Sequence, residues 1–98
     1  MGATREAKNA IEAAAGRRDQ ILPLLVAHKA RCLKEEPGTL QFEILLPNND
    51  DAKILLYEVY RDAAAFDVHR NGSSFARWQK ETAGMVEKLY GTRCEVID

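Results

Sequence analysis

The sequence predicts one α+β domain, because a long helical pattern and two adjoining strand patterns occupy much of its 98 residues. From Arg18 to Glu35, apolar residues recur at the spacing of one face of a helix. Residues 40–44 then alternate apolar and polar side chains, and residues 53–60 are rich in Leu, Ile, Val and Tyr. With 46% hydrophobic and 30% charged residues, the composition is typical of a single globular domain, which we place at residues 1–98, with 1–7 as a flexible extension.

Charge and hydropathy exclude several classes of partner. The formal net charge of −1 gives no general attraction to nucleic acid. The longest apolar run, residues 21–27, is interrupted by Pro23 and is far shorter than the ~20 residues of a membrane span. Because the first residues lack the apolar core of a secretory signal, we expect a cytoplasmic protein with no nucleic-acid or membrane partner. Cys32 and Cys94 form no CxxC motif, so we expect two reduced thiols and no metal site.

Local sequence signals mark the ends of the first helix and the buried face of the strand after it. Asp19 suits the unpaired amides and positive dipole end of a helix start, and Pro37–Gly38 ends the helix. The strand at 40–44 places three apolar side chains on one face that should be buried: Leu40, Phe42 and Ile44.

The second strand is predicted to be central in the sheet. Residues 47–51 are turn formers, which join the two strands as a hairpin. Residues 53–60 are apolar on both faces apart from Glu58, as expected of a strand covered on both sides.

Two short helices are predicted next. Asp62 can cap a helix that stops at Asn71–Gly72. Ser73 or Ser74 can cap another helix that runs to about Ala83.

The two ends of the chain carry weaker secondary-structure signals. Residues 86–97 indicate a final strand broken by Gly91. Residues 5–15 have strong helix propensity, but Ile11 is their only large apolar residue, so a helix there would bury little. A short strand that completes the sheet is the alternative.

Three segments carry a resemblance to a known family: residues 35–43, 56–62 and 65–75. The first contains Glu-Pro-Gly, the second Tyr-Glu-Val-Tyr, and the third Phe-Asp-Val-His. The chain from about Gly16 onward resembles the antibiotic biosynthesis monooxygenase family, which includes quinol monooxygenases and an isomerase that degrades a furanone autoinducer. The scaffold is shared across several chemistries, so the resemblance is specific for the fold and weak for the reaction.

The resemblance implies a ferredoxin-like β-α-β-β-α-β domain that forms a homodimer, a dimeric α+β barrel, through its sheet. It therefore favours a strand at about residues 8–14. It also implies a pocket between the sheet and its own helices, and chemistry without metal, flavin or haem.

Three side chains are the catalytic candidates. His69 falls one turn after Phe66, and its imidazole can take or give a proton near neutral pH. The resemblance also implies a pocket histidine at this position. The alternative is a histidine that only interacts with the end of its helix. Glu58 is the one charged side chain on its strand face, and pairing with Arg61, Arg77 or the other subunit is its alternative. His28 shares a helix face with apolar residues, where a single structural hydrogen bond would also explain it.

The remaining pocket candidates are aromatic and would hold a ring: Phe42, Tyr57, Tyr60, Phe66, Phe75 and Trp78. Most could equally be core residues. Relatives that oxidise aromatic polyketides carry Asn at the position of Leu56 and Tyr at that of Phe66, so this chain departs from their pattern. Ser74 stands where many relatives carry a second histidine.

Together with these residues, the family resemblance implies a monooxygenase that acts without a cofactor on a small cyclic phenolic, quinol or enolisable substrate. His69 would remove a proton, and the resulting electron-rich anion would react with dioxygen. One alternative keeps the same pocket for isomerisation of a furanone-like metabolite, which needs two proton-transfer groups and no oxygen. The other alternative is a domain that binds a small molecule and catalyses no reaction. The presence of Ser74 in place of a second histidine favours this alternative.

Overall fold

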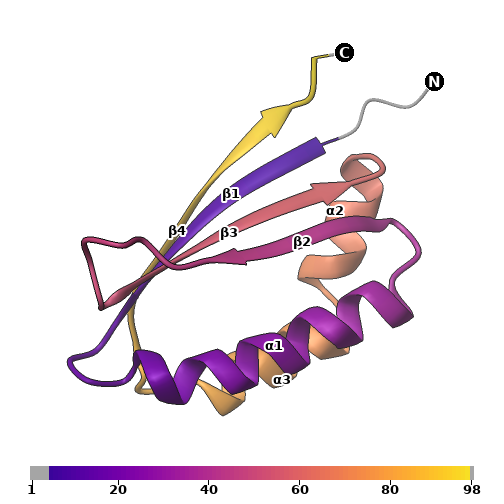
Figure 1. The fold of residues 1–98 in the computed structure, drawn as a ribbon. Helices are drawn as coiled ribbons and strands as arrows, with labels where there is room; N and C mark the ends of the chain where they lie inside the picture. The colour runs from indigo at the N-terminus through magenta and orange to yellow at the C-terminus, as the bar shows by residue number, and fades with distance from the viewer. Residues whose placement is uncertain (1–4, 98) are drawn as a thin grey trace.

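Four antiparallel strands form one sheet with three helices on one face, in a computed structural model that describes residues 5–97 (Figure 1). The elements in chain order are β1 (Arg5–Ala13), α1 (Arg18–Glu35), β2 (Thr39–Leu45), β3 (Lys53–Tyr60), α2 (Ala63–Arg70), α3 (Ser73–Glu81) and β4 (Val86–Glu95). The strand order β2-β3-β1-β4 gives the ferredoxin-like α+β fold that we expected. None of the helices in the described range is long and apolar enough to cross a membrane.

The first segment is a strand, as the resemblance implies and against its helix propensity. β1 pairs with β3 on one side and with β4 on the other, and Ile11 is fully buried. Backbone pairing with strands on both sides outweighs the helix propensity of this segment, because differences in helix propensity are only about 0.5 kcal/mol per residue. Residues 5–7, which we expected in the flexible extension, instead begin β1, and residues 1–4 lie outside the described range.

The helices differ in how they begin. Asp62 caps α2 as predicted, because its Oδ1 accepts a hydrogen bond from the amide of Ala65 at 2.8 Å. The cap predicted for α3 is wrong: the N-cap is Gly72, and no side chain caps the helix. Ser74 points into the molecule instead, where its hydroxyl contacts three side chains of α1, those of His28, Arg31 and Cys32.

Two strand predictions also need correction. Leu40 is 53% exposed, although Phe42 on the same strand is buried. A register shift between Thr39 and Gln41 interrupts the alternation, so Thr39 takes the buried position. β4 runs through Gly91 without a break, because residues 88–95 keep their pairing with β1.

Gly38 allows the start of β2 to approach α2, and we expect any side chain there to destabilise the fold. A Cβ on Gly38 would lie 2.3 Å from Cβ of Ala65. Gly38→Ala should therefore lower the free energy of unfolding by about 1–3 kcal/mol, the usual cost of overpacking. Urea denaturation would measure the loss.

The double variant Gly38→Ala/Ala65→Gly tests the cause. Ala65→Gly alone should cost about 1 kcal/mol through helix propensity, yet in the Gly38→Ala background it should restore stability. Losses that simply add would contradict the clash.

Candidate active site

A cavity of about 550 Å³ lies between the sheet and the helices, and chemically distinct side chains line it. Its buried polar lining comprises His28, Glu58 and His69, and Asn9 adds a half-buried amide from β1. Its aromatic lining comprises Phe42, Phe66, Phe75, Trp78 and Tyr90. A pocket with apolar walls and a few convergent polar groups is the usual form of a small-molecule site.

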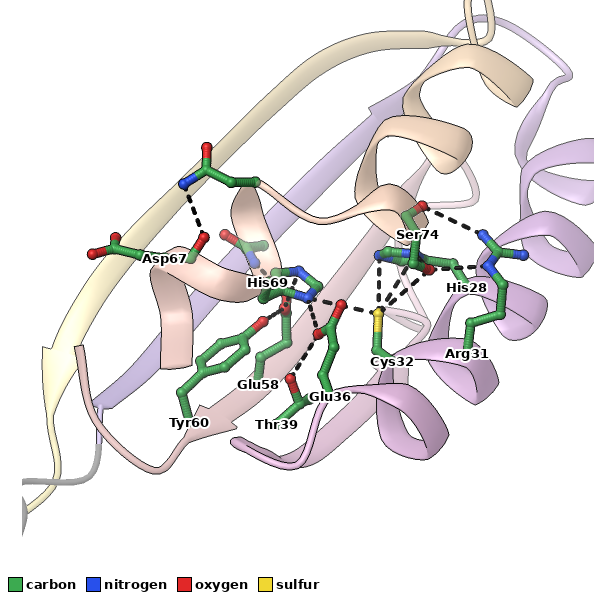
Figure 2. A network of polar contacts seen from close by, with 12 residues as sticks. His28, Arg31, Cys32, Glu36, Thr39, Glu58, Tyr60, Asp67, His69 and Ser74 are labelled. Carbon is green, nitrogen blue, oxygen red and sulfur yellow. Dashed lines mark hydrogen bonds and ion pairs between the residues drawn. The ribbon is translucent and has the colours of Figure 1, made fainter. Parts of the chain in front are cut away.

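His69 lies between two carboxylates (Figure 2). Its ring is 4% exposed; Nδ1 lies 2.8 Å from Oε1 of Glu36, and Nε2 lies 3.7 Å from Oε1 of Glu58. Glu36 is the first residue after α1, and its Oε1 also accepts a hydrogen bond from the hydroxyl of Thr39 at 2.9 Å. In the sequence Glu36 stands out only as part of a segment that resembles the family, and no local pattern indicates that it meets a histidine 33 residues away.

Glu58 is held by two donors from the sheet. Asn9 donates from its side-chain amide to Oε2, and Tyr60 donates its hydroxyl to Oε1. Burial, reinforced by the neighbouring Glu58, raises the pKa of Tyr60 above its ordinary value, so its hydroxyl keeps the proton that it donates. Neither arginine weighed as a partner of Glu58 has this role, because Arg61 pairs with Asp62 and Arg77 with Glu81.

His28 is buried against the cavity in a different environment. Its Nδ1 lies 3.0 Å from Oγ of Ser74, and that hydroxyl oxygen accepts a hydrogen bond from Nε of Arg31 at 2.9 Å. The ring stacks on Trp78 with centroids 5.6 Å apart. Burial, followed by the charges of His69 and Arg31, lowers the pKa of His28 to about 4. The imidazole is therefore neutral near pH 7.

Cys32 completes a cluster that sequence spacing did not reveal. Its Sγ lies 3.6 Å from Nδ1 of His28 and 3.6 Å from Nδ1 of His69. Donor atoms of the three side chains lie within 4.8 Å of one another, a spacing that a transition-metal ion could bridge. Both Nδ1 atoms already contact other groups, Ser74 and Glu36, and an ion there would have to displace these contacts. Burial raises the pKa of the Cys32 thiol to about 12, so it is protonated in this arrangement.

Most of the residues predicted for the site gather at the cavity, but two do not line it. Tyr60 lies behind the cavity, with its ring centroid 5.2 Å from that of His69. Tyr57 lies on the opposite face of the sheet, against a second hollow, because side chains of a strand alternate between faces.

Similarity to known proteins identifies the family to which this chain belongs. A family model for antibiotic biosynthesis monooxygenases matches residues 6–81, and the chain belongs to this family. No curated protein matches the sequence significantly.

Solved structures share the fold at low identity. A Nitrosomonas europaea protein named for the same family has 16% identity and a TM-score of 0.91, covering 99% of this chain and 93% of that one. A Caulobacter crescentus protein, also named for it, has 10% identity and a TM-score of 0.93, covering 99% and 92%. A Pseudomonas aeruginosa protein has 22% identity and a TM-score of 0.90, covering 100% and 98%. These likenesses establish the fold.

The burial of neutral His28 makes stability depend on pH. Between the unfolded pKa of 6.5 and the folded pKa of about 4, the native state binds fewer protons than the unfolded state. The free energy of unfolding should therefore fall as the pH falls from 6.5 to 4, with about 3 kcal/mol contributed by this side chain. Urea denaturation of the wild type and His28→Gln across this range would isolate the contribution; identical pH profiles would contradict it.

Proposed function

We propose that the protein is a monooxygenase that oxidises a small cyclic phenolic, quinol or enolisable substrate without a cofactor. Membership of the antibiotic biosynthesis monooxygenase family supports a monooxygenase-like small-molecule function. The observation that carries the finer proposal is the position of His69, whose ring lines the cavity with a carboxylate near each nitrogen. The absence of any cofactor from the reaction rests on the family resemblance.

In this reaction Nε2 of His69 removes a proton from a phenol or enol in the cavity. The two flanking carboxylates stabilise the imidazolium that forms, much as a carboxylate does in a catalytic triad. General base catalysis of this kind contributes about 10²- to 10⁴-fold to a rate. Phe66, Phe75 and Trp78 supply aromatic surface for the substrate ring.

The resulting anion is electron-rich and reacts with dioxygen. For a quinol, one oxygen atom enters the ring, the other leaves as water, and the substrate supplies both hydrogens of that water. The product is a hydroxyquinone, so atoms and electrons balance without a further reductant.

Isomerisation is the second candidate function, and one distance favours it. Oε1 of Glu58 lies 3.7 Å from Nε2 of His69, and both residues line the cavity. Two adjacent proton-transfer groups suit the movement of a proton between two carbons of an enolisable metabolite, such as a furanone, and this reaction needs no oxygen.

We also infer that the protein is a homodimer formed through the sheet face that the helices leave uncovered. A hollow of about 360 Å³ on this face is lined by Ala10, Leu45, Leu55, Tyr57 and Tyr90. Leu45 is 50% and Tyr90 48% exposed. Contiguous apolar surface of this kind is typical of an interaction site, and the family resemblance supports a second copy of the chain as the partner.

Replacement of His69 tests the base. His69→Ala should reduce oxygen uptake on a panel of quinols and anthrone-like phenols by about 10²- to 10⁴-fold. Val68→Ala is the matched control, because Val68 precedes His69 in α2 and is 61% exposed. An oxygen electrode would measure both variants.

The result separates the two candidate functions. Normal oxygen uptake by His69→Ala would disprove the role of His69 as the base. Exchange of solvent deuterium into the substrate without oxygen uptake by the wild type would instead establish the isomerase.

A charge at the centre of the uncovered sheet face should dissociate the dimer. Leu55 faces Ala10 on one side and Leu45 on the other, so Leu55→Glu would bury a carboxylate at the proposed interface. Sedimentation velocity should show a dimer for the wild type and a monomer for Leu55→Glu. Val26→Glu, on the exposed side of α1, should remain dimeric. A monomeric wild type would exclude the interface.

A further inference from the structure

We propose that Glu36 is a positioning residue, which holds a proton on Nδ1 of His69 and thereby presents an unprotonated Nε2 to the cavity. This inference rests on the proposed function, in which Nε2 is the base. It extends that function by naming the group that makes one ring nitrogen, and not the other, available to the substrate.

Glu36 acts through His69 and is not among the residues that line the cavity. Its carboxylate is buried, with the residue 8% exposed, and Oε1 lies 2.8 Å from Nδ1 of His69. A carboxylate only accepts hydrogen bonds, so this contact requires a proton on Nδ1. In the neutral imidazole the other nitrogen then carries a lone pair.

A second neighbour of the same nitrogen would have the opposite effect. Sγ of Cys32 lies 3.6 Å from Nδ1 of His69, and its protonated thiol could donate a weak hydrogen bond to that atom. Such a bond would leave the ring proton on Nε2, where it blocks proton abstraction. The bond to Glu36 is shorter and charge-assisted, and bonds of that kind are about twice as strong as neutral ones. Glu36 therefore decides the tautomer while it is present.

The carboxylate is fixed before any substrate binds. The amide of Glu36 donates to the carbonyl of Cys32 at 3.0 Å, and its own carbonyl accepts from the amide of Thr39 at 3.0 Å. The Thr39 hydroxyl holds Oε1. On the far side, Gly72 leaves space, since a Cβ there would lie 3.5 Å from Oε2 of Glu36 and 3.0 Å from the carbonyl oxygen of Val68. Preorganisation of this kind keeps a catalytic group in one orientation.

Glu58 does not oppose this arrangement. Both of its oxygens receive donors, from Asn9 and Tyr60, and Oε1 lies 3.7 Å from Nε2 of His69, which is beyond hydrogen-bond distance. Nε2 therefore remains available to a substrate proton, as the proposed reaction requires.

The tautomer can be measured without a substrate. The chain contains two histidines, so ¹⁵N-histidine labelling gives two imidazole spin systems, and His28→Gln assigns them. The wild type near pH 7 should show His69 protonated at Nδ1. Glu36→Gln, whose amide can donate to Nδ1, should move the proton to Nε2. Glu35→Gln is the matched control, because the adjacent Glu35 is exposed, and it should leave the tautomer unchanged.

Kinetics provide the second readout. In Glu36→Gln the kcat for oxygen uptake should fall by about 10²- to 10⁴-fold with KM nearly constant, because the base and not the pocket is altered. If this variant does not fold, as judged by thermal unfolding, Glu36→Asp retains the charge but withdraws it from Nδ1 and should show the same loss.

A wild-type His69 protonated at Nε2 would overturn the proposal, as would an unchanged tautomer and kcat in folded Glu36→Gln. Failure of the proposed function is distinguishable, since it would appear as no oxygen uptake by the wild type, while the ¹⁵N spectrum would still decide the role of Glu36.

Discussion

Two carboxylates and two imidazoles lie buried between the sheet and its helices, and their need for partners organises the site. Glu36, Glu58, His28 and His69 are each no more than 8% exposed. Burial of a polar group without a hydrogen bond costs about 1–3 kcal/mol in proteins, and burial of an unpaired charge costs more. Every one of the four therefore has a polar partner at a defined atom, and those partners fix where protons can reside.

The partners come from almost every element of the fold, so the network ties the two layers together. Glu36 reaches α2 from the end of α1, Glu58 is held by β1 and its own strand β3, and Ser74 joins α3 to α1 (Figure 2). A buried polar network of this kind adds little net stability compared with an apolar core, but removal of one member leaves another unpaired at a cost of about 3–5 kcal/mol. Its main consequence is a single arrangement of the groups around the cavity.

Local signals were sufficient for the parts of the fold that depend on neighbouring residues. The periodicity of residues 18–35 and the cap at Asp62 predicted their helices, and the two-sided apolar pattern of residues 53–60 placed that strand inside the sheet. The same reasoning failed where tertiary contacts decide. Ser74 looked like a cap because its hydroxyl could serve that purpose, and no local feature shows that it meets His28 instead.

The site was predictable in its residue types and not in its pairings. His69 and Glu58 stand out as polar groups that share a face with apolar side chains, and the family resemblance implies a pocket between the sheet and the helices. Glu36 follows an exposed glutamate at a helix end, where a solvated side chain is the ordinary expectation. Its burial depends on the close approach of α2, which Gly38 and Gly72 permit and which no pattern within one element encodes.

The two histidines illustrate how these pairings could separate roles within one cavity. Nδ1 of His28 faces the hydroxyl of Ser74, which can donate or accept a hydrogen bond and whose oxygen also accepts from Arg31. Nδ1 of His69 faces a carboxylate and must be a donor. The same ring nitrogen therefore has a different hydrogen-bond partner in each imidazole, although the two rings are only 5.6 Å apart. Burial, followed by the charges of His69 and Arg31, opposes a positive charge on His28, whereas His69 lies between two carboxylates. The difference between the two histidines arises from the neighbours of each ring and not from the rings themselves.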